Sequence, residues 1–211
     1  MAVTSDNKVL FGLKNINVFS LTETENQGVI TMSYGSAIRV PGAVDITLNI
    51  QEGNQDPFYA DDSVYYLPAL TSNGYDGNVT LADLPVDVRT ALMPYMLDDD
   101  NVVIEQRSKE PQYFGMTFEI DGDVKARKFV YYKCSFGRPT VSGSTKTDSS
   151  TPTTVSVPIK VLPTSKLFEI GSDTNPQSVI SGFTLPGTDS DVYSAWHTTP
   201  HLPTKTTPPG P

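Results

Sequence analysis

The pattern of apolar and polar positions along the chain predicts mainly β-strands. Residues 43–51 alternate strictly, and their apolar side chains fall on every second position: Val44, Ile46, Leu48 and Ile50. A period of two over this length is typical of a strand with one buried face. Residues 113–120 alternate in the same way, and three more segments show a weaker form of the pattern: 9–21, 78–83 and 155–161. We therefore expect roughly six to eight strands.

A hairpin is predicted at Asp121-Gly122, a dipeptide that is typical of tight turns between antiparallel strands. The strand before it has an apolar face of Phe114, Met116, Phe118 and Ile120. The expected return strand, residues 125–136, has an apolar face of Val130, Tyr132, Cys134 and Phe136. Phe129 and Tyr131 stand on its opposite face, which predicts a sheet covered on both sides.

One segment has the features of a helix. Asp83 is suited to cap it, Pro85 to occupy its first turn and Pro94 to end it. Its apolar side chains recur at helical spacing: Leu84, Val88, Ala91, Leu92 and Tyr95. The expected fold class is therefore all-β with one flanking helix, in a two-sheet β-sandwich or a barrel-like arrangement.

Three regions are expected along the chain. Residues 1–165 hold the regular strand pattern and form a β-domain. The pattern weakens over residues 166–198, which we interpret as a C-terminal extension that could dock as short strands or segments. Residues 199–211 are rich in Pro and Thr and are expected to be disordered.

Residues 52–77 combine turn-forming residues and two acidic residues, Asp61 and Asp62, with many large rings. The rings are Phe58, Tyr59, Tyr65, Tyr66 and Tyr75. Two interpretations stay open: a hairpin folded back on its own core, or a projecting arm that includes Asp61 and Asp62 and whose rings pack on another subunit. The second rests on the enrichment of Tyr at protein interfaces.

Composition and charge argue against several classes of function. The net charge of −9 disfavours a nucleic-acid-binding groove, which needs Lys and Arg. The single cysteine, Cys134, is expected to be a buried hydrophobe, and both histidines stand in the Pro/Thr-rich tail, a poor place to hold a base. We find no catalytic or nucleotide-binding motif and expect no enzyme and no cofactor.

No metal site, membrane segment or signal peptide is expected either. Asp98-Asp99-Asp100 is interpreted as a solvated turn, because consecutive carboxylates do not converge on one ion. The N-terminal residues lack a long apolar stretch, and no segment approaches the roughly 20 apolar residues of a membrane span.

The order and spacing of several blocks resemble the major tail proteins of siphophages that infect Gram-positive hosts. The similarity covers roughly residues 8–163. It rests on the blocks at 8–15 (KVLFGLKN), 58–66 (FYADDSVYY), 73–77 (NGYDG), 113–115 (YFG), 121–123 (DGD), 129–134 (FVYYKC) and 138–139 (RP). Residues 192–196 (VYSAW) also look like the terminus of that family, and the Pro/Thr-rich stretch after them departs from its pattern.

This resemblance implies a virion structural protein, made in the bacterial cytoplasm, that forms hexameric rings stacked into a tail tube. The implied partners are other copies of the chain, the tape measure protein, the tail terminator and distal tail proteins. Viral DNA would pass through the bore without specific binding, because each copy carries a charge of −9 and phosphates would be repelled. One domain of about eight strands cannot enclose such a channel alone, so several copies must each contribute a sheet.

Polar faces of the alternating strands are the candidates for the lining of that bore. They are Asp45, Thr47 and Asn49 on one strand and Thr117 and Glu119 on another. The alternative is that these side chains face ordinary solvent. A different class of function, a β-sandwich binding module of a virion such as a capsid decoration or fibre domain, would share the same composition.

Overall fold

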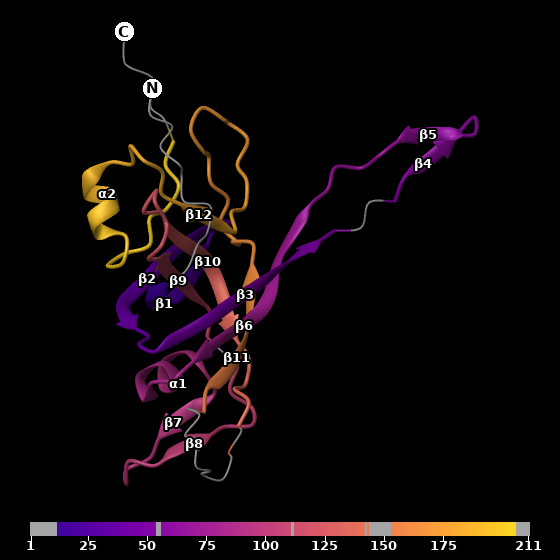
Figure 1. Cartoon of the computed structure of the whole chain (residues 1–211). Helices are drawn as coiled ribbons and strands as arrows, with labels where there is room; N and C mark the ends of the chain where they lie inside the picture. The colour runs from indigo at the N-terminus through magenta and orange to yellow at the C-terminus, as the bar shows by residue number, and fades with distance from the viewer. Residues whose placement is uncertain (1–11, 54–55, 111, 142, 144–152, 206–211) are drawn as a thin grey trace.

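The computed structural model describes residues 12–53, 56–110, 112–141, 143 and 153–205 (Figure 1). Strands dominate this part of the chain. They are β1 (Leu13–Asn26), β2 (Val29–Arg39), β3 (Ala43–Glu52), β4 (Phe58–Ala60), β5 (Ser63–Tyr66), β6 (Ser72–Leu81), β7 (Tyr95–Leu97), β8 (Val103–Glu105), β9 (Phe114–Ile120), β10 (Lys128–Phe136), β11 (Val155–Leu162) and β12 (Ser181–Phe183). The helices are α1 (Val86–Leu92) and α2 (Ser190–Ala195).

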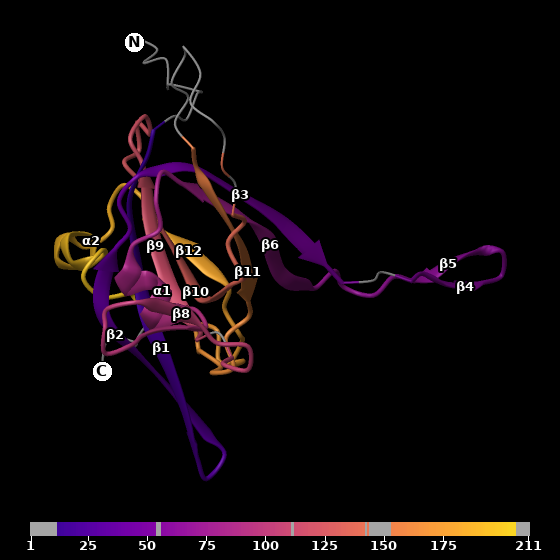
Figure 2. The same cartoon turned by 90° about the horizontal axis from the view of Figure 1, so that it is seen from below.

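Eight of the strands form one antiparallel sheet in the order β2-β1-β9-β10-β11-β6-β3, with β12 added beside β10. The sheet curls until β3 approaches β1 (Figure 2). The expected all-β class with a flanking helix is confirmed, and the barrel-like form describes the curl. The sequence pattern did not separate β2 from its neighbours, and it did not predict α2.

The main core lies inside this curl and is closed on one side by α1. Val88 and Leu92 of α1 are completely buried against side chains from β1, β6, β9, β10 and β11. The helix starts after Pro85, and the Oδ1 atom of Asp83 accepts a hydrogen bond from the Leu84 amide. It ends at Leu92, two residues before Pro94. The predicted helix and its end are therefore confirmed, and Val88, Ala91 and Leu92 of the expected stripe lie on it. The expected cap is wrong, because the N-cap residue is Pro85 and no side chain caps this helix; Leu84 precedes the helix and Tyr95 belongs to β7.

The predicted apolar face of the return strand is wrong. Cys134 and Phe136 belong to the main core, whereas Val130 and Tyr132 face the opposite side and pack with Trp196. The register between β9 and β10 shifts between Tyr131 and Cys134. An extra residue in one strand reverses which face the following side chains occupy, so the alternation read from the sequence changes phase there.

The second face of the sheet is covered by the C-terminal segment, as the apolar character of both faces of β10 predicted. Trp196 is buried on Val130 and Tyr132, and its Nε1 atom donates a hydrogen bond to the carbonyl oxygen of Phe129 at 3.2 Å. Leu202 packs against the same cluster. The extension 166–198 is thus docked on the β-domain.

The expectation of disorder from residue 199 onward is wrong for residues 199–205. Pro200 is buried, the ring of His201 stacks on Trp196, and Lys205 forms an ion pair with Glu169. The Pro/Thr-rich composition predicted disorder wrongly, because a few apolar side chains are enough to dock this segment on the apolar surface around Trp196. Residues 206–211 lie outside the described part of the chain.

Candidate self-assembly surfaces

A long hairpin leaves the body of the protein as the continuation of β3 and β6 (Figures 1 and 2). We call residues 53–71 the arm. At its root the Gly53 amide donates a hydrogen bond to the carbonyl oxygen of Thr71 at 2.7 Å. At its far end β4 and β5 pair with Ala60 opposite Ser63, which leaves Asp61 and Asp62 as a two-residue turn. Both have positive φ, 51° and 60°, as a type I′ hairpin turn requires.

The arm presents large apolar side chains to solvent. Tyr65 is 75% exposed, and Phe58, Tyr59 and Tyr66 are each more than half exposed. The rings of Phe58 and Tyr65 meet edge to face with centroids 6.5 Å apart. The pattern did not single out three further exposed side chains on the arm: Val64, Leu67 and Leu70. An exposed apolar cluster of this kind is typical of a protein interaction site.

Tyr75 does not belong to the arm. It stands within β6, opposite Ile50 of β3, and packs against the main core. Its ring meets that of Tyr131 edge to face at 5.7 Å. The assignment of Tyr75 to the candidate inter-subunit arm is therefore corrected, because the sheet extends further toward the arm than the turn-rich sequence suggested. The folded-back interpretation holds for this residue alone among the rings of 52–77.

Three of the five candidate lining residues lie on the outer face of β3. Asp45, Thr47 and Asn49 are exposed, while Ile46 and Leu48 point toward the core. The Oγ1 atom of Thr47 donates a hydrogen bond to a carboxylate oxygen of Asp45 at 3.1 Å. The strand thus presents a polar, acidic face.

The other two candidate lining residues are corrected. Thr117 has no exposed surface, and its Oγ1 atom lies 3.0 Å from Nδ1 of His197 in the segment that follows α2. Glu119 is half-buried beside the same imidazole, with Oε2 3.7 Å from Nε2, and also accepts a hydrogen bond from Asn15. Neither can line a bore while the C-terminal segment covers β9. The alternation in the sequence correctly predicted that Thr117 and Glu119 point away from the main core. It could not predict that the C-terminal segment covers them.

His197 is held in place, contrary to the expectation for a tail histidine. Burial lowers the pKa of its imidazole, the carboxylate of Glu119 opposes this, and the ammonium group of Lys128 adds to the lowering. Its Nε2 atom is buried without a hydrogen-bond partner among the described residues. The hydroxyl group that contacts this imidazole, that of Thr117, is itself completely buried.

The main sheet has two edge strands, β2 and β3. Among the described residues β2 pairs only with β1, and β3 only with β6. Each therefore has a row of backbone amide and carbonyl groups that can pair with a strand of another chain. The β2 and β3 edges lie at opposite ends of the sheet order, so one copy can offer a different edge to each neighbour.

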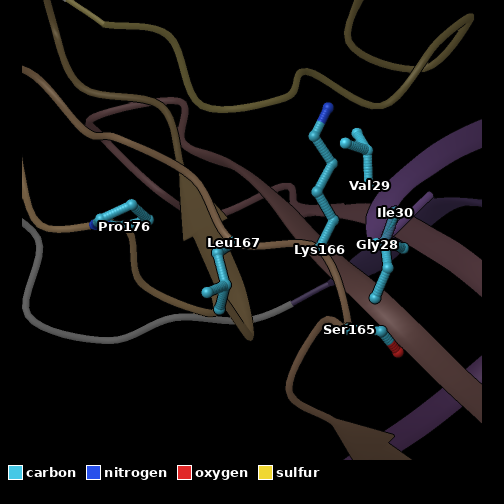
Figure 3. A pocket seen from close by; sticks show the side chains of 7 residues that line it. All are labelled: Gly28, Val29, Ile30, Ser165, Lys166, Leu167 and Pro176. Atoms are coloured by element: carbon cyan, nitrogen blue, oxygen red, sulfur yellow. The ribbon is translucent and has the colours of Figure 1, made fainter. Parts of the chain in front are cut away.

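An open hollow of about 380 Å³ separates the tip of the β1–β2 hairpin from the segment that follows β11 (Figure 3). One side consists of Gly28, Val29 and Ile30. The other consists of Ser165, Lys166, Leu167 and Pro176. Figure 3 shows the Lys166 side chain extended between these two sides. The sequence analysis did not predict this hollow, because its sides come from segments far apart in the chain.

Other chemistry-bearing groups are accounted for within the fold. Cys134 is completely buried, and burial raises the pKa of its thiol. The Oδ1 atom of Asp98 accepts hydrogen bonds from the Asp100 and Val102 amides, which organises the turn between β7 and β8 as predicted. Within the described ranges, no group of three or more His, Cys, Asp or Glu side chains is placed to hold a metal ion.

Neither helix of the described chain has the length and apolar character needed to cross a membrane. Comparison of the chain with protein-family models and with curated proteins gives no match.

Proposed function

We propose that this chain is the major tail protein of a long-tailed bacteriophage and that its copies assemble as stacked rings into the tail tube. The single observation that carries the proposal is the arm, which holds exposed aromatic side chains away from the body (Figure 1). A monomer gains nothing from a long hairpin whose rings remain in water. Burial of these rings on another copy removes that apolar surface from solvent and favours assembly.

The two edges of the main sheet support the same proposal. A tube needs a continuous wall, and the curled sheet of one copy cannot enclose a channel. Pairing of the β2 edge of one copy with the β3 edge of the next would extend the sheet around a ring. The resemblance of the sequence to siphophage major tail proteins supplies the expected hexamer and the location in the virion.

With Thr117 and Glu119 set aside because the C-terminal segment covers them, the proposed lining of the bore is the outer face of β3. Asp45 carries its negative charge, with Thr47 and Asn49 beside it. DNA phosphates would be repelled from such a wall and not held, which suits passage of the genome. The tape measure, terminator and distal tail proteins remain implied partners.

Replacement of the arm tests the proposal directly. Because Gly53 and Thr71 are hydrogen-bonded to each other, residues 54–70 can be replaced by Asn-Gly, a dipeptide that favours a two-residue hairpin turn. Negative-stain microscopy of the concentrated wild-type protein should show tubes or stacked rings. The shortened chain should give folded monomers with an unchanged circular dichroism spectrum.

A full-length variant separates the rings from the length of the arm. Phe58→Ser, Tyr59→Ser, Tyr65→Ser and Tyr66→Ser in one chain keep the hairpin turn at Asp61-Asp62 and should also prevent tube formation. Normal tubes from either variant would contradict the role of the arm. Discrete monomers or trimers of the wild-type protein at all concentrations would instead favour a virion binding module.

A further inference from the structure

Every charged residue of the arm is acidic. Residues 53–71 contain Asp56, Asp61 and Asp62 and no Lys, Arg or His. Asp61 and Asp62 form the turn at the very end of the arm, with the Phe58 and Tyr65 rings just behind them. A surface that receives this tip should therefore be apolar where the rings fit and should carry a cation where the carboxylates arrive.

The hollow between the β1–β2 hairpin and the segment after β11 has this combination. Its sides are largely aliphatic, and Val29 and Leu167 are both more than half exposed. Lys166 is its single charged lining residue. The ammonium nitrogen of Lys166 lies 5.0 Å from the ring centroid of Phe168, and no ion pair joins it to a carboxylate of the described chain. The volume of about 380 Å³ falls in the range of pockets that bind small ligands and side chains.

Two other hollows fit the tip less well. One, beside α2, has Asp191 among its lining residues, which would repel the acidic turn. The other is lined by two cations, Lys14, which already pairs with Asp121, and Arg39, but it is smaller, at about 230 Å³, and its lining includes none of the large exposed apolar side chains of the described chain. Charge disfavours the first hollow, and size and the lack of exposed apolar surface disfavour the second, which leaves the hollow that contains Lys166.

We propose that the arm tip of one copy docks in the Lys166 hollow of another copy, with Asp61 and Asp62 paired to Lys166 and the Tyr65 and Phe58 rings packed on Val29 and Leu167. The contact is between copies, because the arm points away from its own body (Figures 1 and 2). Two different patches meet, so the contact is head to tail. Such contacts generate rings or open-ended filaments and do not stop at dimers. This inference rests on the proposed self-assembly and identifies the surface that receives the arm.

A charge exchange tests the ion pair. Lys166→Glu alone, and Asp61→Lys with Asp62→Lys alone, should each raise the critical concentration for assembly at least about tenfold. The three substitutions combined in one chain should restore assembly toward the wild-type value. Lys125→Glu, a charge change of the same size outside the hollow, is the matched control and should leave the critical concentration unchanged. Equal assembly by wild type and Lys166→Glu would overturn the inference.

A disulfide tests the position of the contact. Tyr65→Cys and Leu167→Cys in one chain should give ladders of covalently linked copies under mild oxidation, and Cys134 contributes little background because it is buried. Tyr65→Cys with Val192→Cys, in α2 at the hollow that contains Asp191, should stay unlinked. Ladders from the control pair alone would place the arm elsewhere and overturn the inference, while wild-type tubes would still support the proposed function. Absence of wild-type assembly would overturn both.

Discussion

The Oγ1 atom of Thr117 and the Nδ1 atom of His197 lie 3.0 Å apart, which joins the middle of β9 to the segment that follows α2. Trp196, the neighbour of His197, is buried on the same face of the sheet. The C-terminal segment is thus fastened by one polar and one apolar contact side by side. This attachment makes the face of β9 opposite the main core an interior surface.

Acidification should weaken this attachment. Burial lowers the pKa of His197 below its ordinary value of about 6.5, with Lys128 contributing and Glu119 opposing. The unfolded chain then takes up the proton more readily than the folded chain. The free energy of unfolding should therefore fall as the pH drops through about 6.5 toward the lowered pKa of the folded state. Urea unfolding of wild type and His197→Gln at several pH values measures this.

The difference between the two proteins is the informative quantity, because other groups titrate in both. Wild type should lose more stability than His197→Gln between neutral and mildly acidic pH. Glu119→Gln removes the carboxylate that favours the protonated imidazole and should make the loss steeper. The same pH dependence in wild type and His197→Gln would contradict the prediction.

Truncation of Trp196 should release the C-terminal segment. Trp196→Ala removes a buried ring from Val130 and Tyr132 together with the hydrogen bond to the Phe129 carbonyl, a loss of about 3–5 kcal/mol. Limited proteolysis should then cut within residues 199–205 at a rate that wild type does not show. Trp196→Phe retains a ring but not the N–H group, so it should be intermediate. Equal protection of all three proteins would argue against this docking.

The β9–β10 turn should depend on Asp123. Its buried carboxylate accepts hydrogen bonds from the Lys125 amide and from the amide and Nε of Arg127, at 2.6 Å in the last case. The guanidinium group of Arg127 and these amides hold the pKa of Asp123 below its usual value. Asp123→Ala should lower the free energy of unfolding by about 2–3 kcal/mol in urea titrations near neutral pH. Val124→Ala, at an exposed neighbour, should change it little.

The fold class and the helix were accessible from the sequence because they depend on local periodicity. The alternation of β9 and the helical spacing of α1 each record which side chains face the core. In β3 the alternation holds for Ile46 and Leu48 but is wrong for Val44 and Ile50, which are more than half exposed near register shifts at the two ends of the strand. The reversal of faces in β10 was not accessible. A one-residue register shift between Tyr131 and Cys134 leaves no signal in a run of residues that are apolar on both faces.

The sequence likewise predicted some parts of the candidate surfaces and missed others. The rings of the arm could be identified because Phe58, Tyr59, Tyr65 and Tyr66 are unusual in a turn-rich segment. Thr117 was misassigned because the cover that buries it comes from eighty positions later in the chain. The Lys166 hollow has sides from two distant segments, and no local pattern predicts which loops will meet.

The pairing of β3 with β6, the two strands that continue into the arm, should tolerate no side chain at Gly77. A Cβ atom there would lie 1.8 Å from the carbonyl oxygen of Thr47 on β3. Since this oxygen belongs to the backbone of a paired strand, Gly77→Ala must separate β3 from β6 where Leu48 stands opposite Gly77. We expect a loss of about 1–3 kcal/mol in urea unfolding, together with reduced tube formation because the arm is no longer held in its direction. Gly143→Ala is the matched control, because a Cβ atom at Gly143 would meet open space, and it should behave as wild type. Unaltered stability and unaltered tubes in Gly77→Ala would show that the pairing of β3 and β6 does not set the position of the arm.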